Sequence, residues 1–438
     1  MLDLCDGSRD VLDRLQHVNP KAITNVSLEF NLMAELVFDQ EWMQILEAIG
    51  SLPYIQQVSL SFRVPLQIPM EAFIEFIELA SSLETLNLIG LQLSSNRFIQ
   101  TASQYSSDSE DDEEEPVDAL IRAFQHHLCL KNVHLCRYRP VKSISTNTAA
   151  AAAAAAAGSE ATGVTDPLLR ALCKTPRLQV FHVERTDIFS DPAVLQLVCG
   201  APFPKIKIGT LERTVPLEHY LPRMGEYLAD NSHLKELEVH HLLQDTALTA
   251  VAQMLRNNTS LLTVSLRIQS NEFGRILDIA LGENCALRNL ELNIVSRDRT
   301  VFRRQVGLLA QSLGANHQSA LTTLTLASKS VRSSNMLTDP FLKMLREDNF
   351  MLQNLVINRN TVPLSPELLF YLKLNQLGRN HFLGRDETED GAPRRERGLL
   401  GSPQDFRIEW VCMLIENKHD VRVLHYFLSR NPLILPTS

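Results

Sequence analysis

A short apolar motif recurs eleven times along this 438-residue sequence and constrains its fold more than any other feature. Each copy has apolar residues at its first, fourth and sixth positions. The copies begin at Ile23, Ile55, Leu83, Leu130, Leu178, Phe203, Leu234, Leu261, Leu287, Leu321 and Leu352. Successive copies begin 25 to 34 residues apart, except for two intervals of 47 and 48 residues. A period of this length is typical of a repeat array in which each unit packs on its neighbours.

Each repeat is expected to contain one strand and one helix. The last two apolar positions of the motif alternate with variable ones, which is the period of a short strand. Several stretches between the motifs have apolar residues at helical spacing, namely 41–48, 70–80, 247–255 and 301–313. Helix starts are predicted at three Asp-Pro pairs, 166–167, 191–192 and 339–340, because Asp caps a helix and Pro suits its first position.

The motif resembles leucine-rich repeats, and the helical half of each unit resembles the ribonuclease-inhibitor-like type of that family. The resemblance covers about residues 20 to 362. It implies an α/β leucine-rich-repeat solenoid that is curved, with a parallel sheet on its concave side, helices on its convex side and helical caps. The family places an asparagine three residues after the last leucine. Asn31 and Asn360 fit this position and Thr186 is a tolerated substitute, but the other repeats lack it, so irregular turns are expected.

The C-terminal part carries a second resemblance. The sequence FYLKLN at 370–375, LGR at 377–379, Trp410 and the sequence YFLSRNP at 426–432 resemble the C-terminal segment of uncharacterised diatom-type algal leucine-rich-repeat proteins. This resemblance implies a scaffold whose partner is unknown.

The sequence predicts three regions. An N-terminal cap spans 1–22, with a helix at 11–18; the repeat array spans 23–363; and a helical cap spans 364–438, with helices at 366–378 and 405–429 and a polar loop at 385–402. Two inserts in the array, 94–116 and 142–165, account for its long intervals and are predicted to be disordered. The second insert contains nine consecutive alanines. The first is acidic, which leaves a solvated loop, an acidophilic-kinase site at Ser107 or Ser109, or a docking tail as its role.

Charge and motif content argue against several classes of protein. The net charge is −9, but seven acidic residues between Asp108 and Glu115 carry most of it and leave −2 for the rest, so no nucleic-acid binding is expected. The seven cysteines are scattered without a CxxC pair, and neither a signal peptide nor a membrane span is predicted. We expect a cytoplasmic monomer, with the nucleus as an alternative compartment. Phosphate-binding loops, HExxH and GxSxG are absent from the sequence, so we expect neither enzymatic activity nor a cofactor.

The candidate site lies where stacked strands bring polar residues together on the concave face. There His134 is predicted to lie beside His182, Lys205 beside Glu236, and Lys207 beside Glu238. Four further candidates for partner binding accompany them, namely Glu184, His240, Arg267 and Glu291. The same residues also fit a ladder of complementary cross-strand pairs with no binding role. A histidine pair without a third ligand is weak evidence for a metal, so no metal is expected.

The function that follows is a non-catalytic protein–protein interaction scaffold. Two alternatives remain open: a GTPase-regulating protein similar to the leucine-rich-repeat activators of Ran, and a substrate receptor of a ubiquitin ligase.

Overall fold

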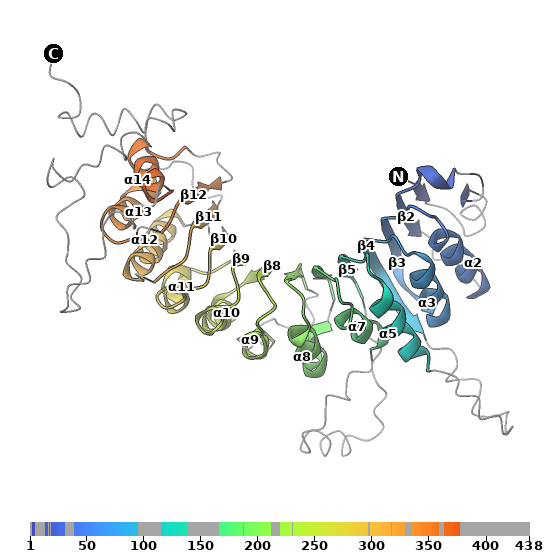
Figure 1. Ribbon diagram of the computed structural model, residues 1–438. Helices are drawn as coiled ribbons and strands as arrows, with labels where there is room; N and C mark the ends of the chain where they lie inside the picture. The colour runs from blue at the N-terminus through green and yellow to red at the C-terminus, as the bar shows by residue number, and fades with distance from the viewer. Residues whose placement is uncertain are drawn as a thin grey trace, which may run out of the picture. The chain divides into compact units, whose positions relative to one another are not determined.

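Strands and helices alternate along the chain in the computed structural model (Figure 1). The structure describes residues 2–4, 14–15, 17, 19–30, 39–94, 115–138, 166–186, 188–211, 220–229, 231–296, 298–316, 318–328, 335–349, 351–358 and 363–376. Within these residues the chain divides into two compact units, Met1–His241 and Leu242–Ser438, which are described separately.

The described residues contain one parallel sheet of twelve strands that follow each other in chain order. The strands are β1 (Leu2–Leu4), β2 (Asn25–Phe30), β3 (Gln57–Pro69), β4 (Thr85–Ser94), β5 (Asn132–Cys136), β6 (Val180–Glu184), β7 (Lys205–Ile208), β8 (Glu236–Leu243), β9 (Thr263–Ile268), β10 (Asn289–Ile294), β11 (Thr323–Ser328) and β12 (Asn354–Ile357). Strands β2 to β12 coincide with the eleven predicted motifs, so the α/β repeat architecture is confirmed. Strand β1, which pairs with β2, was not predicted.

Helices connect successive strands and lie together on one side of the sheet within each unit (Figure 1). They are α2 (Asp39–Gly50), α3 (Met70–Leu79), α5 (Pro116–His126), α7 (Pro167–Cys173), α8 (Pro192–Gly200), α9 (Leu221–Ala229), α10 (Asp245–Asn257), α11 (Phe273–Leu281), α12 (Arg299–Ala315), α13 (Asn335–Glu347) and α14 (Pro366–Gln376). Two short 3-10 helices, η1 (Pro20–Ala22) and η2 (Ile188–Ser190), complete the described elements. We call the opposite side of the sheet the helix-free face.

The core lies between the sheet and the helices and is built from the motif's apolar positions. In β4, for example, Leu86 and Leu88 are fully buried, whereas Asn87 between them is half-buried. Burying a leucine side chain contributes about 1.5–3 kcal/mol, so eleven such units supply the main stabilisation of the array. The same alternation directs the residues between the buried ones to the helix-free face.

The four helices predicted between the motifs and two of the three predicted helix starts are confirmed. Asp166 accepts a hydrogen bond from the Leu169 backbone N–H at the start of α7, and Asp191 accepts one from the Ala193 N–H at the start of α8. The prediction at 339–340 is wrong, because α13 begins at Asn335 and contains Pro340 in its interior. An isolated Asp-Pro pair therefore does not identify a helix start when the surrounding turns pack as helix.

Asparagines do stabilise the turns, but mostly at a position that the sequence analysis did not consider. They lie at the ends of helices and comprise Asn231, Asn258, Asn284, Asn316, Asn349 and Asn375. All of them except Asn375, which belongs to the last described helix, precede a strand by a few residues. Asn284 is typical: its Nδ2 donates to the Leu255 and Asn258 carbonyls of the preceding repeat, and its Oδ1 accepts from the Ala286 and Leu287 N–H groups. Asn231, Asn316 and Asn349 likewise join two repeats and fix their own turns. We call this row the asparagine ladder.

The position predicted from the family pattern is occupied more sparsely. Thr186 is buried there, donates to the Tyr138 carbonyl at 2.6 Å and accepts from the Ile188 N–H, in line with its prediction as a substitute. Asn31 and Asn360 lie outside the described residues. Asn358, which was not predicted, has a positive φ of 45° and accepts a hydrogen bond from the Ser328 N–H.

The predicted ends and inserts are described only in part. Arg14, Leu15 and His17 are helical, within the predicted helix at 11–18, and α14 matches the helix predicted at 366–378. Of the acidic insert predicted at 94–116, the two end residues belong to β4 and α5. Residues 95–114 of this insert, the alanine-rich insert, the loop at 385–402 and the helix at 405–429 lie outside the described residues. Among the helices that are described, none has the length and apolar character needed to cross a membrane.

Candidate functional site

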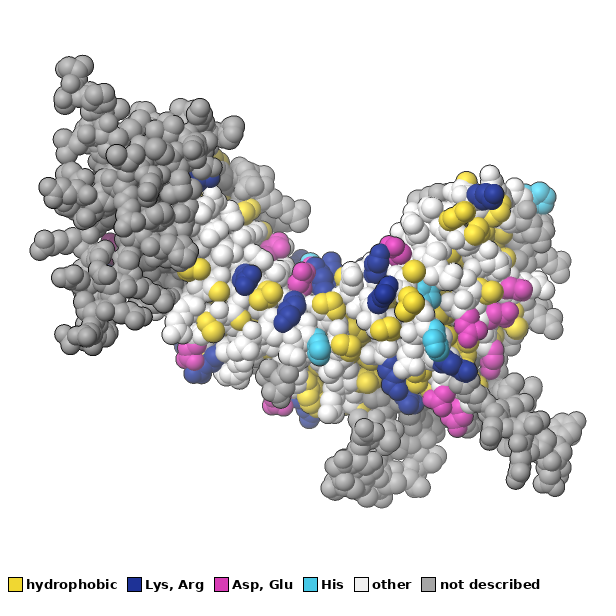
Figure 2. Space-filling view, in the orientation of Figure 1, with side chains coloured by type: hydrophobic (Ala, Val, Ile, Leu, Met, Phe, Trp, Pro, Cys, Tyr) yellow, Lys and Arg dark blue, Asp and Glu magenta, His cyan; other side chains and the backbone are white. Residues whose placement is uncertain are grey.

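The polar residues predicted at the centre of the array lie on the helix-free face of the first unit. The strand register pairs His134 on β5 with His182 on β6, His182 with Lys207 on β7, and Lys207 with Glu238 on β8. Lys205 and Glu236 form a second matched pair one step earlier on β7 and β8. We use the name central patch for His134, His182, Glu184, Lys205, Lys207, Glu236, Glu238 and His240. In the view of Figure 2, acidic, basic and histidine side chains are intermixed on the first unit.

Glu238 is the centre of the charged part of this patch. Its two oxygens lie 2.6 Å from Lys205 Nζ and 3.1 Å from Lys207 Nζ, and His240 Nε2 lies 3.3 Å away. Lys205 also contacts Glu236 at 2.6 Å. The two predicted Lys–Glu pairs are therefore confirmed. They are not independent, because Glu238 forms ion pairs with both lysines.

The contacts of Glu238 with both lysines shift the pKa values of Glu238 and Lys205. Burial raises the pKa of Glu238, but hydrogen bonds and charges from Lys205 and Lys207 outweigh it and bring the pKa down to about 2. Burial lowers the pKa of Lys205, and the hydrogen bonds to Glu236 and Glu238 reverse this and raise the pKa above its ordinary value. Glu238 and Lys205 are therefore held in their charged forms at neutral pH. The formal charges of the two lysines and two glutamates cancel.

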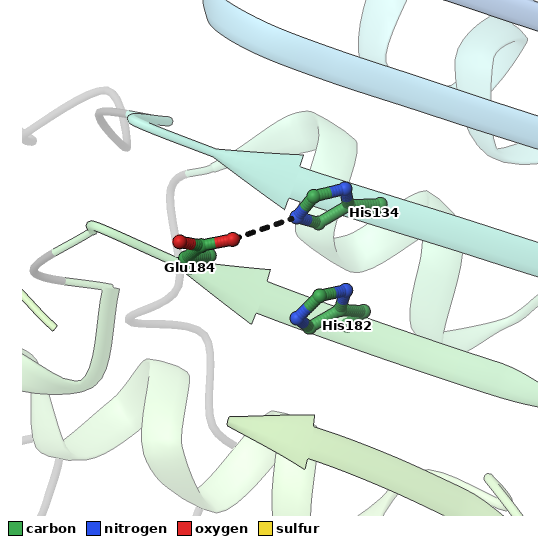
Figure 3. A group of neighbouring side chains, drawn as sticks. All are labelled: His134, His182 and Glu184. Carbon is green, nitrogen blue, oxygen red and sulfur yellow. Dashed lines mark ion pairs between the residues drawn. The ribbon is translucent and has the colours of Figure 1, made fainter. Parts of the chain in front are cut away.

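The histidines form a separate group with Glu184, shown in Figure 3. The rings of His134 and His182 are stacked, with centroids 4.0 Å apart and planes inclined by 8°. His134 Nε2 points toward the Glu184 carboxylate, 3.8 Å from Oε2. This distance is too long for a hydrogen bond. His134 Nε2 is buried and has no hydrogen-bond partner among the described residues.

Both histidines are neutral at neutral pH. Burial lowers the pKa of His134, and the Glu184 charge opposes this without reversing it. Burial also lowers the pKa of His182, together with charges on His134, Lys207 and His240, to about 4. Neutral imidazoles keep a free nitrogen lone pair, which is the form that accepts hydrogen bonds or binds metals.

The backbone around Glu184 holds its side chain close to the histidines. Glu184 ends β6, and Arg185 follows it with a positive φ of 49°. The Arg137 N–H donates to the Glu184 carbonyl at 3.0 Å. Gly209 provides the space, since a Cβ atom there would lie 2.7 Å from Glu184 Cγ and 2.9 Å from its Cβ. Any larger residue at 209 would displace the carboxylate.

A shallow depression adjoins both groups. Its volume is about 290 Å³, close to the lower limit for small-molecule pockets. It is lined by Asn87, Asn132, Val133, His134, Val180, His182, Lys205 and Lys207. Asn87 and Asn132 are residues that the sequence analysis did not single out as candidates, although their strand register could have identified them.

Two predicted candidates belong to the second unit and are not members of the central patch. Arg267 is exposed on β9, and Glu291 is exposed on β10, where its Oε2 accepts a hydrogen bond from Ser265 Oγ at 3.3 Å. The adjacent histidines 126 and 127 have separate environments. His126 is exposed, whereas His127 is buried, with Nε2 2.8 Å from the Ala80 carbonyl and Nδ1 accepting from the Leu130 N–H. His127 is thus a structural residue that fixes a turn.

A scan against protein-family models finds no family that matches this chain, and no curated protein matches its sequence.

Proposed function

We propose that this chain is a non-catalytic scaffold that binds a protein through the helix-free face of its first unit. The observation that carries the proposal is the central patch, a set of side chains from four neighbouring strands that no described helix covers. Repeat arrays commonly bind through such extended sheet surfaces. The motif leaves these positions free of any packing role, because the buried residues alternate with them.

The chemistry of the patch favours a polar partner surface. Its depression is lined by two asparagines, two histidines and two lysines, with only two valines and no Phe, Tyr or Trp. Aromatic anchors dominate tight, dry interfaces, so their absence favours a wet interface with many hydrogen bonds. Specificity would then come from complementary charge and hydrogen bonding to the Lys–Glu cluster.

The experiment compares partner capture by four versions of the full chain. The wild type is used beside Asn87→Arg, which fills the depression, and Lys207→Gln, which removes one charge while Glu238 keeps Lys205. Arg256→Gln is the matched control, because it removes an ion pair with Glu283 from the helical layer. Captured proteins are quantified by mass spectrometry, and the strongest is then purified and titrated directly.

The proposal requires direct binding that falls at least about tenfold in both patch variants, a loss of about 1.4 kcal/mol, and stays unchanged in the control. Equal binding by all four folded proteins would exclude the central patch. A loss of binding in the Arg256→Gln control alone would indicate that the partner binds the helical layer instead.

A further inference from the structure

We propose that His134, His182 and Glu184 form a binding site for one divalent transition-metal ion of the zinc class. Each of the three residues offers one ligand atom, and these atoms all lie within 4.8 Å of one another (Figure 3). Two imidazoles and one carboxylate are a ligand set that zinc uses when a fourth position stays open. This site goes beyond the protein-binding role and does not depend on it.

The scaffold places the ligands before any ion arrives. His134 and His182 are register partners on β5 and β6, and Glu184 follows His182 by two residues on the same face of β6. Sites built on paired strands hold their geometry better than sites on loops. The predicted histidine pair lacked a third ligand in the sequence, because register alone does not show that the Glu184 side chain reaches sideways to His134.

The ligand atoms must still approach one another before they can share one ion. With bonds of about 2.0–2.1 Å, the ligand atoms of a tetrahedral zinc ion lie about 3.3 Å apart. His134 Nε2 and Glu184 Oε2 are 3.8 Å apart, so they need to approach by about half an ångström. The two stacked rings must also tilt toward each other, so that their nitrogen lone pairs converge on one point. The present separations of the ligand atoms, all within 4.8 Å, therefore have to shorten through changes in the side-chain torsions.

An unpaired buried nitrogen in this group indicates a ligand. His134 Nε2 is a buried polar atom without a hydrogen-bond partner among the described residues, and burying such an atom costs free energy. A metal ion would satisfy the unpaired nitrogen directly.

The surrounding charges tolerate a cation. Lys207 is the nearest strand neighbour of His182, but Glu238 neutralises it at 3.1 Å. Arg185 Nε lies 3.6 Å from Glu184 Oε1, on the other carboxylate oxygen from the one that faces His134. Nitrogen ligands favour zinc, copper, nickel and cobalt over magnesium and calcium, which prefer sites made only of oxygen.

Zinc binding to the purified full chain tests the proposal. Isothermal titration with Zn²⁺ gives the stoichiometry and affinity, and Co²⁺ serves as a spectroscopic probe of the ligands. The test variants are Glu184→Gln, which keeps the size of the side chain, and His182→Gln. The matched control is His126→Gln with His233→Gln, which removes two exposed imidazoles outside the group. Melting curves confirm that each variant is folded.

We expect one Zn²⁺ per wild-type chain and an unchanged affinity in the control. Each test variant should bind at least about 100-fold more weakly, since even residues outside the ligand shell change metal affinity 10- to 100-fold. Bound Co²⁺ should show visible d–d bands without a thiolate charge-transfer band. The proposal is overturned if the wild type binds no zinc, if the folded Glu184→Gln and His182→Gln proteins bind as well as the wild type, or if a thiolate band shows that cysteines hold the ion.

Discussion

Replacing Glu238 by Gln tests whether the charged part of the central patch is a coupled cluster. Glu238 is 18% exposed and accepts contacts from Lys205 and Lys207. Glutamine keeps the shape but removes the charge. Lys205 then retains Glu236, while Lys207 loses the acidic partner described for it. Exchanging Lys207 and Glu238 for each other is not a neutral change either, because the new lysine at 238 would face Lys205.

The size of the effect follows from the pKa of Glu238. A glutamate that titrates near 4.3 when unfolded and near 2 when folded corresponds to about 3 kcal/mol of stabilisation. Because the lysines and Glu236 remain partly in water, screening reduces this figure to about 1–2 kcal/mol. The sign is that of a depressed carboxyl pKa: the stabilisation is complete above about pH 5 and is lost as the pH falls toward 2.

Urea unfolding of the two proteins at pH 7 and pH 3 measures this contribution. At pH 7 the Glu238→Gln protein should be about 1–2 kcal/mol less stable, and at pH 3 the difference should fall to about half. Glu283→Gln is the control, because the exposed pair with Arg256 should contribute less than about 1 kcal/mol. A Glu238→Gln protein as stable as the wild type at pH 7, or a difference that is independent of pH, would refute the reasoning.

Three further predictions concern single side chains. Gly209→Ala should weaken zinc binding about tenfold in the titration above, because the new Cβ displaces Glu184; an unchanged affinity would show that the carboxylate is not held by this contact. Tyr138→Phe should lower the free energy of unfolding, measured in urea, by about 1–3 kcal/mol. The reason is that the buried Tyr138 hydroxyl lies 2.8 Å and 2.9 Å from the two oxygens of Asp166. A loss below about 0.5 kcal/mol would contradict this prediction. Asn284→Ala should destabilise by about 2–4 kcal/mol and increase amide exchange at its turn, because four hydrogen bonds are removed; protected amides in a stable variant would show that the asparagine ladder is dispensable.

The repeat architecture was predictable from the sequence because burial imposes a period on it. Every motif from Ile23 to Leu352 leads into a strand, since apolar residues at two alternating positions have only the helical layer to pack against. Strand β1 was not predicted because its three residues are too few to contain the six-position motif. The interior Pro340 of α13 shows the opposite case, in which a local signal for a helix start is overridden by packing.

The candidate site was predictable only to the level of strand neighbours. In-register stacking was enough to place His134 beside His182 and Lys207 beside Glu238. Contacts that run diagonally between strands depend on side-chain torsions and on the space left by other residues. The approach of Glu184 to His134 depends both on side-chain torsions and on available space. That space is left by Gly209, which directly follows β7.

The uneven distribution of the asparagine ladder has a consequence for the order in which the array folds. Before β9, β10, β11 and β12, the turns are fixed by Asn258, Asn284, Asn316 and Asn349. Before β4, the first unit has Ala80 in place of a ladder asparagine, and before β5 and β6 it has His127 and Thr175. Because a repeat array behaves as a chain of nearest-neighbour couplings, folding should nucleate in the second unit and spread toward the N-terminus. Strands β5 and β6, which carry His134 and His182, would then form late and open first, whereas the turn before β8 is fixed by Asn231.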